Sequence, residues 1–372
     1  MTIRRIRPRT DAGYTIIELL ISMAIMLVVT GAIFELVNPG NATSQTQPEV
    51  QDMQQRMRVA TDTLFKDIVM AGAGPYQGPV TGSLMGFFAP VLPRCWGDAC
   101  PSAAGATTNT TALTSTISLT YIPNSYSQTT ISSAMPPNST ELKVTAQPNC
   151  PDGQELCGFY VGEEVIIFDT SGHFDTFTIT QVQDDAGHLQ HRGSDLNYSY
   201  DIGASVTQVE SHTYYLDTST HQLMHYDGSD NAPVPVADNV VGLTFDYFGD
   251  PAPPTTPKPE LGVANCLYDA SGTYLGGSMD TLTTGGASMA PLPVSMFTDG
   301  PWCGSGDTEF DADLFRVRRV RVTLRVETPV DRLRGTNTSL FAIPGTATEG
   351  QRFVPDLVTR FEVAPRNMNL SR

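Results

Sequence analysis

The chain has 372 residues, of which 40% are hydrophobic and only 16% are charged, with 32 glycines and 27 prolines. This mixture is too apolar for general disorder and suits a loop-rich β protein, as one elaborated domain or two ordinary ones. The formal net charge of −17 disfavours non-specific nucleic-acid binding by the chain as a whole. Any such role requires a local basic patch.

A basic leader precedes a long apolar run. Four arginines stand against one carboxylate at Asp11; they are Arg4, Arg5, Arg7 and Arg9. The apolar run extends from Tyr14 to Val37, and its charges are Glu18 near the start and Glu35 near the end. A run of this length can span a bilayer as a helix, and its basic flank is expected to stay on the cytoplasmic side.

Three interpretations of this N-terminus compete. An ordinary secretory signal has a shorter apolar region and a small-residue cleavage site, which Val29-Thr30-Gly31 matches poorly. A plain signal anchor accounts for the hydrophobicity but leaves Glu18 unexplained, because a carboxylate inside an apolar segment is costly in lipid. A third interpretation must give this carboxylate a partner.

Gly13 followed by Tyr-Thr-Ile-Ile-Glu resembles the cleavage motif of prepilins, the precursors of type IV pilins. The resemblance implies that a membrane peptidase cuts after Gly13, that Tyr14 becomes an N-methylated N-terminus, and that the apolar helix stays on the mature protein. It also implies that Glu18 compensates the amine of a neighbouring subunit when helices bundle in the membrane. Tyr14 replaces the usual phenylalanine, and Leu27 and Glu35 stand where major pilins commonly carry glycine and proline.

A second helical pattern follows an expected interruption at 38–48, which contains Pro39-Gly40 and polar residues. Apolar residues then recur at spacings of three and four, which predicts an amphipathic helix ended by Gly72, Gly74 and Pro75. Its apolar seam comprises Val50, Met53, Met57, Ala60, Leu64, Ile68 and Ala71. The segment 51–78 resembles minor pilins of the PilW type and, more loosely, the J-class pseudopilins of type II secretion.

Short β-type runs broken by Gly, Pro, Asn and Asp follow from residue 77 onward. The predicted strands are 116–122, 141–146, 159–169, 174–182, 204–217, 221–226, 239–248, 315–327 and 357–364. Parts of 205–370 resemble the same two families, including the run RVRRVRVTLRVET and the C-terminal FEVAPRNMNL. The segments 77–200 and 250–312 carry no such resemblance and are predicted elaborations, with exposed loops at 96–138.

The predicted strand at 315–327 changes phase along its length. Apolar residues alternate with polar ones from 320 to 326, whereas Phe315 and Val317 fall on the opposite parity. A bulge at Arg318-Arg319 would return all the apolar side chains to one face, and a regular ladder there would refute this hypothesis.

The six cysteines fall in short-range pairs downstream of an export signal, which indicates disulfides in an oxidising compartment. The nearest-neighbour pairing is one of 15 connectivities open to six cysteines. It joins Cys95 to Cys100, Cys150 to Cys157, and Cys266 to Cys303. In the loop-entropy model, the last of these stabilises the fold by about 3–4 kcal/mol.

Two polar clusters raise metal hypotheses. One combines His188 and His191 with Asp184 and Asp185, against the alternative of a hairpin turn with solvated side chains. In the other, acidic side chains alternate before a strand, at Asp307, Glu309, Asp311 and Asp313. Calcium binds clustered oxygens, but the EF-hand spacing is missing, and a solvated acidic loop is the preferred interpretation.

No nucleophile elbow, Walker loop or H-E-x-x-H helix occurs in the sequence, so no enzymatic activity and no firm cofactor is predicted. One basic cluster interrupts the acidic chain, at arginines 316, 318, 319, 321, 325, 332 and 334. Phosphate or DNA binding is one interpretation of it. Pairing with carboxylates of this or a neighbouring subunit is the preferred one, and no specific nucleic-acid partner is predicted.

The sequence therefore predicts an α+β, pilin-like protein whose long N-terminal helix has a transmembrane half and an amphipathic half. The expected divisions are a leader at 1–13, the transmembrane helix at 14–37, a linker and amphipathic helix at 38–76, and a large antiparallel β-rich domain at 77–372. The expected function is that of a minor pilin at or near the tip of a type IV pilus, which primes or supports assembly. The alternatives are a type II secretion pseudopilin and a membrane-anchored adhesin or enzyme outside any filament.

The resemblance also implies partners and a location. The partners are other minor pilins and the major pilin, the prepilin peptidase/N-methyltransferase, the inner-membrane assembly platform and the inner membrane. The expected location is the inner membrane, with a cytoplasmic N-terminus and a periplasmic C-terminal domain, and later the pilus at the cell surface.

Overall fold

The computed structural model describes most of the chain. It covers residues 13–75, 82–96, 100–105, 111–123, 127–147, 150–191, 196–228, 232–348 and 352–369, apart from the side chains of 35–45 and 307. The arginines of the leader lie outside the described residues.

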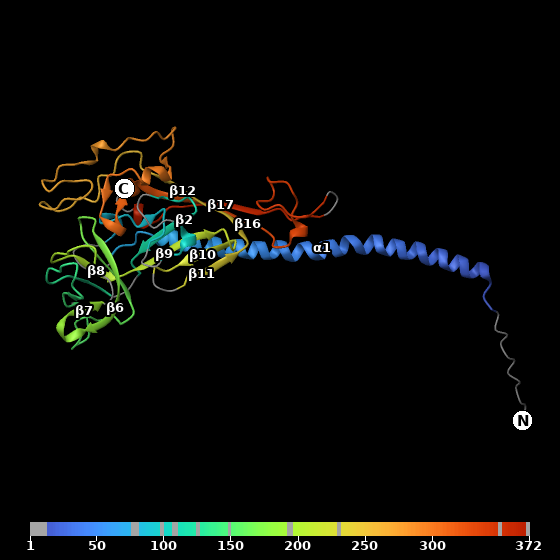
Figure 1. Ribbon diagram of the computed structural model, residues 1–372, viewed down its shortest axis with the longest axis horizontal. Coiled ribbons are helices and arrows are strands. Elements are labelled where there is room, and N and C mark those ends of the chain that lie inside the picture. Colours follow the sequence, from blue (N-terminus) through green and yellow to red (C-terminus); the bar gives the residue numbers. More distant parts are fainter. Residues whose placement is uncertain are drawn as a thin grey trace, which may run out of the picture.

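A single α-helix, α1 (Ile16–Met70), runs for 55 residues as one rod from the N-terminal end into the globular part (Figure 1). The expected break at 38–48 is wrong, since the backbone stays helical through Pro39-Gly40. A proline removes one hydrogen bond, whereas helix propagation on both sides is cooperative and continues the rod. The predicted end is confirmed: Gly72, at φ 80°, carries the chain away from the helix.

The C-terminal part of α1 packs on two antiparallel sheets through its apolar seam. Leu64, Ile68 and Ala71 are completely buried, but Val50, which was assigned to the seam, is 38% exposed. Each fully buried leucine or isoleucine stabilises this contact by about 1.5–3 kcal/mol. The helix contacts strands of both sheets, so it lies at the centre of the main core.

Among the described residues, the two sheets contain nine strands. The five-stranded sheet has the order β1 (Val91–Leu92), β2 (Thr116–Tyr121), β9 (Glu210–Asp217), β10 (Gln222–Tyr226) and β11 (Val234–Asp238). The four-stranded sheet has the order β13 (Ala290–Leu292), β12 (Val240–Gly249), β16 (Val317–Val326) and β17 (Leu357–Val363). These sheets and the C-terminal part of α1 are called the main domain below.

A second unit is inserted between β2 and β9, which are hydrogen-bonded neighbours in the five-stranded sheet. Its strand order is β3 (Gln128–Thr130), β8 (Ser205–Gln208), β5 (Glu164–Phe168), β6 (Phe174–Gln183), β7 (His188–His191) and β4 (Glu141–Lys143). Beyond these strands, Ser132 N donates to Lys143 O at 2.9 Å and Thr145 N donates to Thr130 O at 2.8 Å. These bonds join the two end strands, so the sheet closes into a small barrel with its own core.

The barrel docks on the main domain through aromatic rings. Phe88 stacks on Phe174 with ring centroids 4.4 Å apart, and Phe87 meets Phe168 edge-on at 4.7 Å. Trp96 adds a further edge contact with Phe174 at 5.1 Å. Aromatic pairs of this kind contribute about 0.5–1.5 kcal/mol beyond their burial, so the barrel is held in place and not merely tethered.

Several strand predictions need correction. The predicted strand 204–217 is two strands, β8 of the barrel and β9 of the main domain, because the chain crosses between the units at Val209. The predicted strand 159–169 is only β5, since Gly158 and Gly162 adopt positive φ in the preceding turns. The region 96–138, predicted as exposed loops around 116–122, also supplies β3 and buried residues such as Ile131.

The bulge hypothesis in β16 is confirmed. Gly249 pairs with Val317 while Phe248 pairs with Arg319, so Arg318 is the extra residue. Val317 and Val320 are both fully buried in the same core, as the bulge requires. Phe315, also buried, belongs to a short 3₁₀ helix and not to the strand.

Short elements complete the fold. A small ribbon consists of β14 (Trp302–Cys303) and β15 (Phe310–Asp311). Short 3₁₀ helices are Leu84–Gly86, Ser102–Ala104, Asp184–Ala186, Gly276–Ser278, Val294–Phe297, Gly306–Thr308, Ala312–Arg316, Asp331–Leu333 and Asn367–Asn369. The barrel and the 250–312 segment (orange) both lie at the end of the molecule away from the apolar half of α1 (Figure 1).

Candidate processing and assembly site

The predicted processing residues lie immediately before α1. Gly13, Tyr14 and Thr15 precede the helix, and Tyr14 is 90% exposed. Thr15 has φ −78° and ψ 151°, an extended conformation, and Ile16 is the first helical residue. The Gly13–Tyr14 peptide bond therefore lies outside the helix.

Glu18 and Thr15 form a capping box at the helix start. The Thr15 backbone N–H and hydroxyl both donate to Glu18 Oε2 at 2.9 Å, and Glu18 N–H donates to Thr15 Oγ1 at 3.4 Å. This reciprocal arrangement satisfies backbone donors that the first turn of a helix otherwise leaves unpaired. The resemblance to prepilins implies a role for Glu18 in assembly and does not predict this local contact, whose signal in the sequence is the pattern Thr-x-x-Glu before an apolar run.

The apolar half of the helix is uncovered. The stretch Ile16–Phe34 has 19 residues with a mean hydropathy of 2.5, and none of it is buried against the rest of the chain. At about 1.5 Å per residue it is about 28 Å long, close to the thickness of a bilayer core. Only a membrane or other apolar helices would keep this surface from water.

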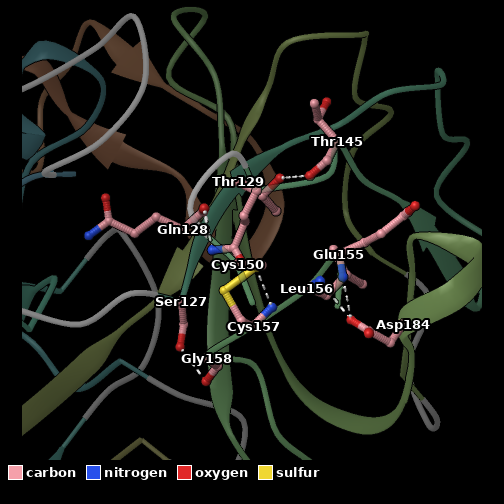
Figure 2. The surroundings of a disulfide bond; sticks show 11 residues. Ser127, Gln128, Thr129, Thr145, Cys150, Glu155, Leu156, Cys157, Gly158 and Asp184 are labelled. Carbon is pink, nitrogen blue, oxygen red and sulfur yellow. Dashed lines mark hydrogen bonds between the residues drawn. A yellow bond between two sulfur atoms is a disulfide. The ribbon is translucent and has the colours of Figure 1, made fainter. Parts of the chain in front are cut away.

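Three disulfides brace the globular part. They join Cys95 to Cys100, Cys150 to Cys157, and Cys266 to Cys303. Figure 2 shows the second pair beside Ser127, Gln128 and Thr129 near the start of β3. Asp184 accepts hydrogen bonds from the backbone of Glu155 and Leu156, at 3.0 and 2.7 Å, so the loop that this disulfide closes is also held against the turn before β7.

The histidine cluster does not form the metal site considered from the sequence. His188 pairs with Glu141 of β4, Nδ1 to Oε1 at 2.9 Å, whereas His191 is 3% exposed and packs against Phe177. Asp184 contacts backbone amides instead. The alternation of β7 turns the two histidines to different surroundings, which spacing in the sequence did not reveal.

The acidic run is only partly brought together. Asp311 and Asp313 are buried, so the preferred interpretation of a solvated acidic loop is wrong for these two residues. Their carboxylate oxygens lie within 4.8 Å of one another and of a carboxylate oxygen of Asp299, and Glu309 is not part of this group. Burial raises the pKa of Asp313 to about 7, and the carboxylates of Asp311 and Asp299 add to the shift. The positive charge of Arg316, whose Nε lies 2.5 Å from Oδ1 of Asp313, opposes this rise in pKa. The side chain of Asp307 lies outside the described residues.

Six of the seven arginines of the basic cluster pair with carboxylates of the same chain, and the seventh, Arg332, is exposed. Arg319 and Arg321 both contact Glu362, at 2.9 and 2.6 Å, and hold the pKa of its carboxyl below its usual range. The other contacts join Arg316 to Asp313, Arg318 to Asp250, Arg325 to Asp356, and Arg334 to both Glu327 and Asp331. This neutralisation supports the pairing interpretation over phosphate binding.

A buried polar network that the sequence did not predict joins α1 to β9 and β10. Asp67 of α1 is 5% exposed and accepts a hydrogen bond from the hydroxyl of Tyr214 on β9. His212 Nδ1 lies 3.9 Å from Asp67 Oδ2 and 2.7 Å from His225 Nε2 on β10. Asp67 stands next to Ile68 and three residues after Leu64 on the apolar face, where a carboxylate must find a partner. The network ties the last turns of α1 to the five-stranded sheet.

Comparisons with known proteins bear on the N-terminus. The family described as the prokaryotic N-terminal methylation motif matches residues 8–34. No curated protein sequence matches the chain. Among solved structures, a type IV-like pilin from Thermus thermophilus is similar at 12% identity, over 56% of this chain and 86% of that one, with a TM-score of 0.18.

The structure consists of a long N-terminal helix and an antiparallel β-rich domain. The residues that match the methylation motif include Gly13 and the exposed apolar stretch of α1 from Ile16 to Phe34. In this chain the methylation motif therefore opens an exposed apolar helix that leads into an antiparallel β-rich domain, the arrangement expected from the resemblance to type IV pilins.

Proposed function

We propose that this chain is a minor pilin of a type IV pilus, cleaved after Gly13 and built into the filament through α1. The observation that carries this proposal is the uncovered apolar helix with Glu18 at its start. A buried core helix would have its apolar surface covered by the rest of the chain, whereas a filament subunit needs that surface for its neighbours. The motif and the fold point to a structural pilin rather than to an enzyme.

Two stages follow from the physics of the helix. Before assembly, α1 holds the subunit in the inner membrane, with the basic leader in the cytoplasm and the β domain in the periplasm. After cleavage, the new amine of Tyr14 and the carboxylate of Glu18 on adjacent subunits have opposite charges. Their pairing makes each charge tolerable among apolar helices and sets the stagger between subunits.

The position at or near the tip is inferred from the size of the end of the molecule that lies away from the membrane helix. The barrel and the 250–312 segment widen the end of the molecule away from the membrane helix (Figure 1). A subunit inside a shaft has neighbours beside and above it, whereas a subunit at the tip has free space above. A large distal end is accommodated most easily at the tip, where it would prime or support assembly together with other minor pilins.

Processing is tested by intact mass and N-terminal sequencing of the protein from membranes of its native host. A start at Tyr14, with or without a methyl group, supports the proposal. An intact Met1, or a start after the apolar run, contradicts it and leaves an anchored or secreted β protein.

Assembly is tested with Glu18→Gln, which removes the charge, and Glu18→Asp, which retains it. Incorporation into sheared filaments should fail for the first and survive in part for the second. A simple anchor would be indifferent to both. Immunogold labelling confined to filament ends supports the tip position, and labelling along the shaft contradicts it.

The alternative of a type II secretion pseudopilin is separated by a deletion strain scored in parallel for piliation and for protein secretion. Loss of piliation with normal secretion supports the pilus assignment. Loss of secretion alone transfers the same assembly chemistry to the secretion system.

A further inference from the structure

The capping box begins α1 just beyond the proposed cleavage site. Thr15 is the N-cap residue, and Glu18 is the third residue of the helix. The bond between Gly13 and Tyr14 therefore lies one residue before the cap, in chain that has left the helix. The position of the helix start relative to this bond is set by one hydroxyl and one carboxylate.

Little else in the local sequence stops the helix there. Ile16, Ile17 and Leu19 are apolar and exposed, and the described structure around them offers no packing that favours one start over another. At a membrane surface, extending a helix satisfies backbone groups internally, which lipid otherwise leaves unsatisfied. Without the cap, helix is expected to extend through residues 15 and 14 toward Gly13, where glycine disfavours it.

Hydrolysis of this bond requires an accessible, extended backbone. Water adds across the peptide bond, which leaves a carboxylate on Gly13 and an ammonium group on Tyr14. A peptide bond within a helix has its polar groups directed along the helix axis and is enclosed by neighbouring turns. Recognition of extended peptides depends on main-chain groups that are free to pair with the enzyme.

We propose that Thr15 is a positioning residue for prepilin processing. Its capping box with Glu18 holds the helix start at Ile16 and keeps the Gly13–Tyr14 bond extended for the membrane peptidase. This inference rests on the proposed cleavage after Gly13. It gives Glu18 a first task in the precursor, as a capping partner, that precedes its charge-compensating task in the filament.

The two tasks of Glu18 place different demands on its side chain. Capping needs an oxygen acceptor, which glutamine also supplies at the third helical position. Compensation of an amine needs a negative charge. Glu18→Gln should therefore be processed like the wild type yet fail to assemble, which separates processing from assembly within one residue.

The test follows cleavage of the full chain in membrane vesicles that contain the peptidase, with the product identified by mass. Thr15→Val keeps the shape of the side chain and removes the hydroxyl, whereas Thr15→Ser keeps the hydroxyl. We expect Thr15→Val to lower kcat/KM about 2- to 30-fold, the range that corresponds to a lost N-cap. Thr15→Ser should restore the wild-type value.

The loss should lie in KM, with kcat unchanged, because the peptidase would bind only the fraction of precursor whose cleavage site is extended. Cleavage of Thr15→Val at the wild-type rate, or equal slowing of Thr15→Ser, overturns the inference and leaves the proposed function intact. A wild-type chain that the peptidase leaves uncut overturns both.

Discussion

The main domain and the barrel are both antiparallel and both well packed, but they are built in different ways. In the main domain, α1 is the central element, and the strands that cover it come from distant parts of the chain. In the part of the barrel that the structure describes, no α-helix lies at the centre, and six strands close on one another around a separate core. The chain leaves the five-stranded sheet after β2 to form the barrel and returns to that sheet at β9, and β2 and β9 are hydrogen-bonded neighbours.

β5 shows where the two constructions meet. Val165 and Ile167 face the barrel core, whereas Ile166 and Phe168 face the main core, and all four are completely buried. A strand between two cores has no polar face, so it reads as a continuous apolar run rather than as an alternating one. The barrel is thus a separate unit by topology but shares an apolar seam with the main domain.

The largest expected effect is at this seam. Phe88→Ala removes a completely buried ring that stacks on Phe174 of the barrel. The expected loss is about 3–5 kcal/mol in the free energy of unfolding, measured by urea denaturation. Phe65→Ala, at a ring 49% exposed on α1, is the control and should cost far less. Equal losses would mean that the seam contributes nothing special to stability.

Adjacent isoleucines of β5 sharpen the comparison. Ile167→Ala and Ile166→Ala make the same chemical change at positions that are both fully buried, and each should cost about 2–5 kcal/mol. Hydrogen exchange should rise mainly in barrel amides for Ile167→Ala, and on both sides of the seam for Ile166→Ala. Identical exchange patterns would show that the two cores unfold as one unit.

Two of the disulfides close loops of different length, one in the barrel and one in the main domain. Cys150 and Cys157 are separated by 7 positions within the barrel, whereas Cys266 and Cys303 are separated by 37 in the elaboration of the main domain. Loop entropy predicts losses of about 2.5 and about 4 kcal/mol when each pair is replaced by serine. Urea midpoints of the two double variants test this order. The reverse order would mean that local packing outweighs the entropy of the unfolded chain.

The smallest expected effect is a pH dependence confined to the main domain. Burial, with His212 close by, lowers the pKa of His225 below its usual value. Asp67 and Asp227 oppose the shift, and Lys66, Glu210, Tyr121 and Tyr214 are the other titratable groups of the network. The unfolded chain binds the proton more readily, so stability should fall as pH drops below about 6.5 toward the folded pKa.

Urea midpoints at about pH 7.5 and 5.5 measure this loss relative to His225→Gln, whose own pH dependence lacks the contribution of residue 225. Hydrogen exchange should increase at acid pH in β9 and β10 rather than in the barrel. An identical pH dependence of wild type and variant would refute the assignment to His225.

Helical and strand periods explain which predictions succeeded. The seam from Met53 to Ala71 and the phase change at Arg318 are local signals, because a residue's neighbours at fixed spacing decide which face it occupies. The expected break at Pro39-Gly40 was also a local signal, and it failed because helix on both sides continues the rod. The nearest-neighbour disulfides were a choice among connectivities that only the structure could resolve.

For the candidate site, the Gly13–Glu18 motif and the apolar helix are contiguous in the chain, so the sequence alone determined their order, length and charge. Only the tertiary structure decided that β3 and β4 close a barrel, that Asp67 meets Tyr214, and that the arginines of β16 are neutralised. Each of these contacts joins residues on different elements of the fold. Their pairing depends on how the chain packs as a whole, which periodicity and spacing do not encode.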